Sequence, residues 1–277
     1  MKKEKIITIM LSCIAIFILC CFFINKITIN NIIKTQYTKS LYSIPSINKN
    51  GIIYLDKNLN QDVDLSIIPE CLKINEKSHK LKYQKVITII ICEDDQASGR
   101  IFKIFKTKAS GFAFSDNLII LNYNNLYKLG YTFESIIKHE SSHTLIKQNI
   151  KSFITMILTF SNRSLWFSEG FASYNQGLVI YTQEELNNEL ASYNIKYDNK
   201  SNNFYTVPQY IRLDYSMYYY FMKHLIGKYG INKVLDYLNI MIKDYKSSDD
   251  NFYKIFGSNI YEEINEFTTK ILNKNLI

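Results

Sequence analysis

The stretch "IIKHESSHTLIKQ", residues 136–148, places two histidines four positions apart and a glutamate directly after the first. Side chains four residues apart lie on the same face of an α-helix, so the rings of His139 and His143 would stack there. Two such imidazoles can bind one Zn²⁺, with Glu140 one step around the helix and facing the water at the metal. The competing interpretation is an accidental pattern on a surface helix, and the flanking sequence has to decide between the two.

The segments before this motif predict a sheet, and the motif itself predicts a helix. Thr132 can cap a helix from about Phe133 to Lys147 that would carry both histidines. Three apolar runs precede it and are typical of strands, the second of them buried. These runs cover residues 51–56, 85–92 and 111–121.

The chain after the motif is mainly helical, so we predict an α+β fold. Thr182 and Glu185 form a capping box at the start of one of these helices. We expect one domain, 51–277, in which a part with a small mixed sheet, 51–131, precedes a helical part, 132–277. The further helices are expected at 183–193, 216–229, 232–245, 250–256 and 260–273.

A catalytic zinc site needs a third protein ligand and one open position. The stretch "SLWFSEGFASY", residues 164–174, offers Glu169, which lies 26 residues past His143. We expect Glu169 near the start of a second helix, with Ser168 as the candidate cap. Alone, Glu169 would equally fit an ordinary first-turn glutamate that interacts with the helix dipole. Together with the histidine pair, the ligand interpretation is favoured.

The N-terminus predicts a membrane anchor. Three lysines precede an uncharged, mostly apolar run, Ile6–Ile24, which would span about 28 Å as a helix and could cross a bilayer core. A cleaved signal peptide usually has a shorter apolar run that ends in small residues, so an uncleaved signal anchor is favoured. Residues 1–25 would then form a cytoplasmic tail and a transmembrane segment, with the rest of the chain outside the cell. Residues 26–50 are polar and are expected to form an irregular stalk.

Composition narrows the class of partner. With 47% hydrophobic and 21% charged residues, the chain of 277 residues can bury a sizeable core. The net charge of +8 is spread along the chain, without a basic cluster interleaved with aromatics and without a Gly-rich phosphate loop. We therefore expect no nucleic-acid partner, while weak attraction to anionic lipid or wall polymers stays open. Of the five cysteines, Cys71 and Cys92 follow the apolar run, and a disulfide between them is one option that two isolated thiols support only weakly.

The two motifs together resemble a known class. HExxH followed by W-x-x-E-G-x-A, here Trp166 to Ala172, is the signature of the gluzincins, zinc peptidases with two histidine ligands and one glutamate ligand. The spacing to Glu169 is longer than in their aminopeptidase-like branch, and Gly111–Phe114 lacks the acidic exopeptidase motif expected on that strand. The chain is more similar to the small peptidase MA-like group, whose members are often membrane-anchored or secreted. This similarity covers roughly 85–277 and includes a pattern matched by Tyr215, Phe221, Leu225, Tyr229 and Gly230.

The resemblance implies one Zn²⁺ per chain, held by His139, His143 and Glu169, with Glu140 as the general base that hydrolyses a peptide or protein substrate. It also implies that substrate lies along Gly111–Phe114 as an added strand. Tyr215 would be the phenol that hydrogen-bonds the oxyanion, although among 22 tyrosines a packing role is an equal alternative. Since no acidic site for a free N-terminus is evident, an endopeptidase is favoured over an aminopeptidase.

Two alternatives from other classes remain open. One is a catalytically idle, peptidase-like binding module on the outer membrane face, which would have no physical need for Glu140. The other is an anchored structural protein without a metal. Neither of the two remaining histidines is expected to belong to the site. His224 is expected to have a structural role within its helix, and His79, in the polar stretch "EKSHK" (76–80), is expected to be exposed.

Overall fold

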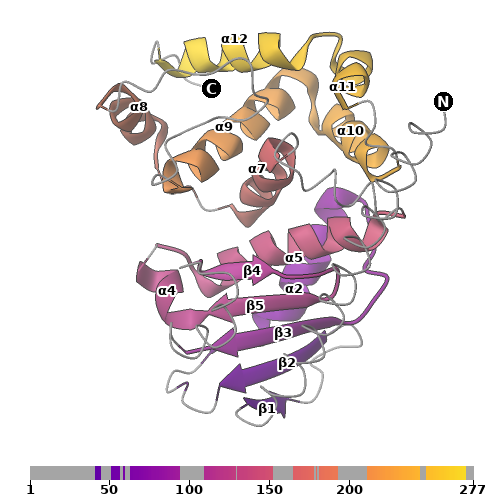
Figure 1. Cartoon of the computed structure of the whole chain (residues 1–277), viewed down its shortest axis with the longest axis vertical. Coiled ribbons are helices and arrows are strands. Elements are labelled where there is room, and N and C mark those ends of the chain that lie inside the picture. Colours follow the sequence, from indigo (N-terminus) through magenta and orange to yellow (C-terminus); the bar gives the residue numbers. More distant parts are fainter. Residues whose placement is uncertain are drawn as a thin grey trace, which may run out of the picture.

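A computed structural model describes most of the chain after residue 40. The described residues are 41–44, 51–56, 59, 63–93, 109–128, 130–151, 165–177, 179, 181–192, 211–243 and 248–272. In Figure 1 the sheet lies in the lower half of the molecule, the helices α7 to α12 lie in the upper half, and α5 lies between them. This α+β arrangement, a mixed sheet followed by helices, agrees with the sequence prediction.

The described sheet has five strands in the order β1-β2-β3-β5-β4. Its centre is parallel, with β2 beside β3 and β3 beside β5, whereas β1 and β4 run antiparallel along the two edges. The strands are β1 (Leu41–Ile44), β2 (Gly51–Asp56), β3 (Ile87–Cys92), β4 (Gly111–Ala113) and β5 (Leu118–Asn122). The predicted strands at 51–56 and 85–92 are therefore confirmed.

The structure corrects two predictions for this part of the chain. The run 111–121 forms two strands instead of one, because the chain reverses at Phe114–Asn117 and β4 folds back on β5. Ser, Asp and Asn at positions 115–117 are typical turn residues. The segment 26–50, predicted to be an irregular stalk, contributes β1, which pairs with β2; the rest of that segment, apart from 41–44, lies outside the described residues.

Helices α2 (Ile67–His79), α4 (Tyr123–Lys128) and α5 (Phe133–Asn149) accompany the sheet. Apolar side chains of all three join those of the central strands in one buried core. The sequence predicted α5 correctly, including its cap: Thr132 Oγ1 accepts a hydrogen bond from Ser135 N, and Ser135 Oγ accepts one from Thr132 N. This reciprocal capping box at the N-terminus fixes the residue at which α5 begins, and so the rotation of its histidine face.

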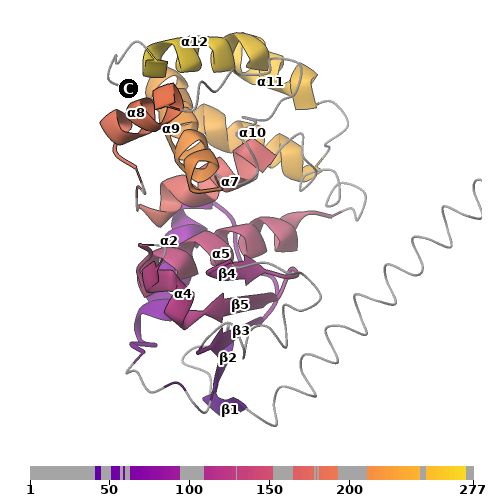
Figure 2. The same ribbon diagram turned by 60° about the vertical axis from the view of Figure 1, so that its left-hand side comes forward.

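The second half consists of helices around an aromatic core, which includes Trp166, Phe167 and Phe221. Helix α7 packs between α5 and α9, so it connects the two halves of the molecule (Figure 2). The predicted helices are confirmed, with α9 beginning five residues earlier than expected. Their bounds are α7 (Leu165–Gln176), α8 (Gln183–Ser192), α9 (Ile211–Tyr229), α10 (Ile231–Lys243), α11 (Ser248–Phe256) and α12 (Ile260–Leu272).

The structure leaves the membrane prediction untested. None of the described helices is both long and apolar enough to span a bilayer, and the run Ile6–Ile24 lies outside the described residues. Cys71 and Cys92 are both buried and are not joined by a disulfide, so the disulfide option is not realised. Burial raises the pKa of the Cys71 thiol to about 11, which keeps it in the unreactive protonated form at neutral pH.

Candidate metal centre

Helices α5 and α7 bring His139, His143 and Glu169 together. Glu169 Oε2 lies 3.2 Å from His139 Nε2 and 3.3 Å from His143 Nε2, and the two Nε2 atoms are 3.2 Å apart. A tetrahedral zinc ion with ligands at about 2.0–2.1 Å would separate those ligands by roughly 3.3 Å. The three donor atoms therefore form one face of a tetrahedron of the size that Zn²⁺ requires.

Each histidine is held from behind through its other ring nitrogen. His139 Nδ1 lies 3.0 Å from Gln176 Oε1, and His143 Nδ1 lies 3.0 Å from Ser168 Oγ. An amide oxygen only accepts, so His139 Nδ1 must carry a proton, and in the neutral ring Nε2 then presents a lone pair to the metal position. Such contacts orient the ligand rings before a metal binds.

Two of these positions correct or extend the sequence analysis. Ser168 is not the cap of the second helix: α7 begins at Leu165, and the Ser168 side chain contacts His143 instead. Gln176 was missed, although a signal existed, since it follows Glu169 by seven residues and so lies on the same face of the helix.

The site favours a positive charge at the point where the three donors meet. Burial alone would raise the pKa of Glu169, but the charge of His143 and hydrogen bonds with both histidines hold it far below its ordinary value. Burial alone would lower the pKa of His139, but its hydrogen bond to Glu169 and the charges of Glu140 and Glu169 raise it. With two imidazoles and a carboxylate as donors, the residues present fit a divalent zinc ion.

Glu140 lies between this centre and the edge strand β4. Ala113 N donates a 2.7 Å hydrogen bond to Glu140 Oε2. A Cβ added at Gly111 would lie 2.9 Å from Glu140 Cγ and 3.0 Å from its Oε1, so only glycine leaves room for this carboxylate. Glu140 is thus held in place from β4 by a main-chain N–H and by the space that Gly111 leaves.

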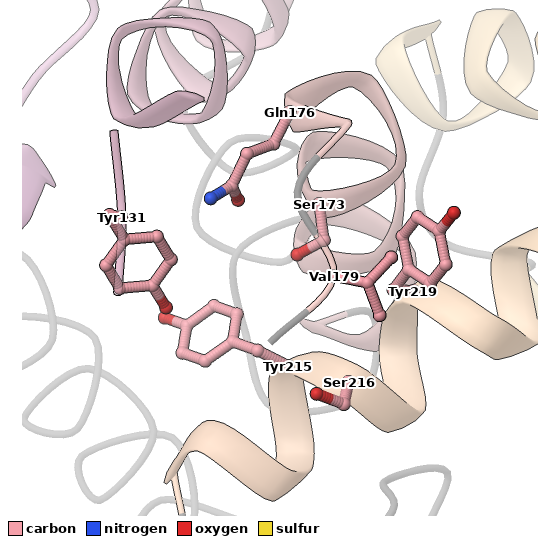
Figure 3. A pocket seen from close by; sticks show the side chains of 7 residues that line it. All are labelled: Tyr131, Ser173, Gln176, Val179, Tyr215, Ser216 and Tyr219. Carbon is pink, nitrogen blue, oxygen red and sulfur yellow. The ribbon is translucent and has the colours of Figure 1, made fainter. Parts of the chain in front are cut away.

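Tyr215, from the first turns of α9, reaches the same centre. Its ring packs edge-on against His139, with the centroids 5.6 Å apart. The charge of Glu169, burial and the charge of Glu140 raise the pKa of Tyr215 well above its ordinary value, so it keeps its proton at neutral pH. Tyr215 also lines a small pocket, with about 230 Å³ of free space partly open to solvent, together with Tyr131, Gln176 and Tyr219 (Figure 3).

Helix α2 braces the back of the histidine helix and was not predicted. Asn75 Nδ2 donates to Ser141 Oγ and to the Lys138 carbonyl, both at 2.7 Å. His79 Nε2 lies 2.7 Å from Ser142 Oγ, so both serines of the HExxH motif bind to α2. These contacts resist rotation of α5 about its axis.

The prediction that His79 is exposed was wrong, because its ring is fully buried. Its Nδ1 donates to the Asn75 carbonyl, which leaves Nε2 to accept from Ser142, and its ring packs edge-on against Phe171 of α7. Burial lowers the pKa of His79 to about 4, so the ring is neutral at physiological pH.

The structural interpretation of His224 is confirmed. Its Nε2 lies 3.3 Å from the buried carboxylate of Glu263, which also accepts hydrogen bonds from Lys228 and Tyr229. The Lys228 ammonium group thus already neutralises this second His/Glu cluster. The cluster connects α9 to α12 and is separate from the candidate metal centre.

A helix that carries HExxH, packed against a second helix that supplies a glutamate to the same point, defines the zinc-peptidase class known as gluzincins. The Peptidase MA superfamily profile matches residues 71–273, and the chain belongs to that superfamily. Among curated proteins, no relative of significant similarity was found.

Solved structures support the fold. The chain is similar to the M1 zinc metallopeptidase from Deinococcus radiodurans, with a TM-score of 0.51 and 10% sequence identity, over 82% of this chain and 51% of that one. A mutant of that enzyme bound to a Tyr-Ser-Ala substrate, and a mutant of a two-domain M1 zinc metallopeptidase bound to L-arginine, match with the same values. The chain therefore spans about half the length of these structures, and at this identity the likeness concerns the fold alone.

Proposed function

We propose that this chain is a zinc-dependent peptidase in which His139, His143 and Glu169 hold one Zn²⁺. The observation that carries this proposal is the triangle of donor atoms with sides of 3.2–3.3 Å, each imidazole being oriented through its Nδ1. Zn²⁺, when bound, supplies a Lewis acid that activates water at neutral pH and polarises the peptide carbonyl.

Glu140 is the general base in this proposal. Its carboxylate takes the proton of the attacking water and returns it to the amine that leaves. Ala113 N holds one oxygen in place, and Gly111 leaves the space in which the other can receive the proton. Tyr215 donates its phenolic hydrogen to the oxyanion that develops on the carbonyl oxygen, and its contact with His139 supports this position.

We infer an endopeptidase rather than an aminopeptidase. Substrate would pair with the edge strand β4, which carries no carboxylate at Gly111–Ala113 or at Phe114 to bind a free α-ammonium group. The run Ile6–Ile24 would anchor the protein in the cell membrane, with the peptidase domain on the extracytoplasmic side.

Metal analysis and hydrolysis test this function. The purified full chain in detergent should contain one Zn²⁺, and His143→Ala should lose most of it, because two remaining ligands make a poor site. Hydrolysis of a mixed peptide library should depend on that zinc. Stoichiometric zinc in His143→Ala would overturn the ligand assignment, and a zinc-loaded protein that cleaves nothing would favour the binding module.

Topology needs a separate test. Protease added to intact cells should digest the domain while an N-terminal fragment stays in the membrane. Release of a mature chain without residues 1–25 would show that the apolar run is a cleaved signal peptide.

A further inference from the structure

Among the described residues β4 is the last strand of the sheet, and helix α5 supplies hydrogen-bond partners to its side away from β5, called the open edge below. The pairing with β5 uses Ser110 O and Phe114 N, so alternate residues face β5, and the main-chain groups of Gly111 and Ala113 face the open edge. Ala113 N donates to Glu140 Oε2, and Ala113 O accepts a 2.6 Å hydrogen bond from Lys147 Nζ. A positive charge therefore lies at the edge where substrate would pair.

Lys147 belongs to the face of α5 that carries the candidate metal ligands. It follows His143 by four residues, one helical turn or about 5.4 Å farther along the axis. An extended peptide rises about 3.3 Å per residue, so this offset corresponds to between one and two residues of substrate. The ammonium group itself reaches Ala113 O, next to the Ala113 N–H that holds Glu140, so it can meet a substrate side chain one to three residues from the cleaved bond.

The contacts also give the direction in which a bound peptide would run along β4. Helix α5 and strand β4 run the same way, because Glu140 lies against Gly111 and Ala113 while Gln148 Nε2, farther along the helix, donates to Asp116 O at 2.7 Å. A peptide added antiparallel to β4 would therefore have its amino-terminal part at Lys147. The residues that face Lys147 are then those that precede the cleaved bond.

We propose that Lys147 is a specificity-determining residue, which selects peptides with a carboxylate one to three residues before the cleaved bond and disfavours a free α-ammonium group there. An ammonium group has three donors, so Lys147 can bind a carboxylate while it keeps or exchanges its contact with Ala113 O. This inference rests on the proposed function and deepens it, since a cation at this end of the edge strand explains in charge terms why the chain would not trim N-termini.

The test compares matched peptides that differ only by Asp versus Asn, or Glu versus Gln, before the cleaved bond. Wild type should cleave the acidic member with a kcat/KM about tenfold higher, as expected for a hydrogen bond to a charged group. Lys147→Met should reduce this ratio to about one, and Lys147→Arg should keep it. Lys147→Glu should disfavour the acidic member and should favour peptides with lysine at that position. Lys138→Met is the matched control, because Lys138 lies on the same helix but pairs with Glu134, and it should leave the ratio unchanged.

A second arm keeps the inference testable if no peptide is cleaved. Binding of the same peptides to the Glu140→Gln protein should show the acidic preference and should lose it with Lys147→Met. Cleavage without a charge preference, or a preference that survives in Lys147→Met, would overturn the role of Lys147 while leaving the peptidase intact. A preference for a carboxylate after the cleaved bond, including a free C-terminus, would show that the peptide runs in the opposite direction and would also overturn the assignment.

Discussion

Gln176 offers a sharp test of how the chain prepares its metal centre. Its Oε1 accepts from His139 Nδ1 at 3.0 Å, and both side chains are buried. Gln176→Met keeps the length of the side chain but removes the acceptor, which leaves a buried N–H without a partner. That loss costs about 1–3 kcal/mol.

Most of this cost should fall on the zinc-bound state. With a metal at Nε2, His139 is restricted to the tautomer with the proton at Nδ1, whereas without a metal the ring can turn or change tautomer. We therefore expect Gln176→Met to weaken zinc binding roughly 10–100-fold, the range found when a partner behind a ligand histidine is removed. Gln176→Glu restores an acceptor at the same place and should bind zinc at least as tightly as wild type.

The assay is a competition titration of zinc-free protein against a chromophoric chelator, accompanied by thermal unfolding of the zinc-free forms. Asn251→Leu, which replaces a buried amide in α11 away from the site (Figure 1), controls for the general effect of losing a buried polar group. Wild-type zinc affinity in Gln176→Met would refute the orienting role. An equal loss of zinc affinity in Asn251→Leu would show that the effect is not specific to the contact between Gln176 and His139.

Three further substitutions test the remaining parts of the site. Tyr215→Phe should keep zinc and stability but lower kcat on the order of 10²–10³-fold, as for a lost oxyanion donor, and unchanged turnover would make it a packing residue. Gly111→Ala should displace Glu140 and destabilise the fold by about 1–3 kcal/mol, whereas Gly227→Ala, with no atom within 4 Å of the added Cβ, should be neutral or stabilising in thermal unfolding. His79→Phe should flatten the fall in stability between about pH 6.5 and pH 4. In wild type the pKa of His79 is depressed to about 4, so the unfolded chain binds the extra proton in that window and stability is lost as pH falls; an unchanged pH profile would contradict the buried neutral ring.

The sequence specified the histidine helix because its signals are local. Thr132 caps it, apolar residues set its rotation, and the spacing of His139 and His143 alone places both rings on one side. The carboxylate of Glu169 could be proposed as a partner only because the second motif accompanies the first. The packing of α7 against α5, which brings Glu169 close enough to share a metal with His139, depends on tertiary contacts that no local sequence pattern contains.

Helix α2 was missed because the second half of its buried face is polar. Asn75 and His79 point at α5 and replace the apolar residues that a period of 3.6 would need, while Pro69 in the first turn resembles a loop signal although that position tolerates proline. His79 was assigned to the surface for the same reason. A polar residue can be buried wherever a specific partner such as Ser142 meets it, and composition does not reveal that partner.

Glu140→Gln tests the central claim most directly. Glutamine keeps the size of the side chain and one oxygen acceptor but cannot take a proton, so zinc content and thermal stability should stay near wild type. Since proton transfer by a positioned side chain contributes roughly 10²–10⁴-fold, hydrolysis of a peptide that wild type cleaves should fall by at least that range. Zinc retained with activity lost is the result that the account predicts; wild-type hydrolysis by Glu140→Gln would contradict it.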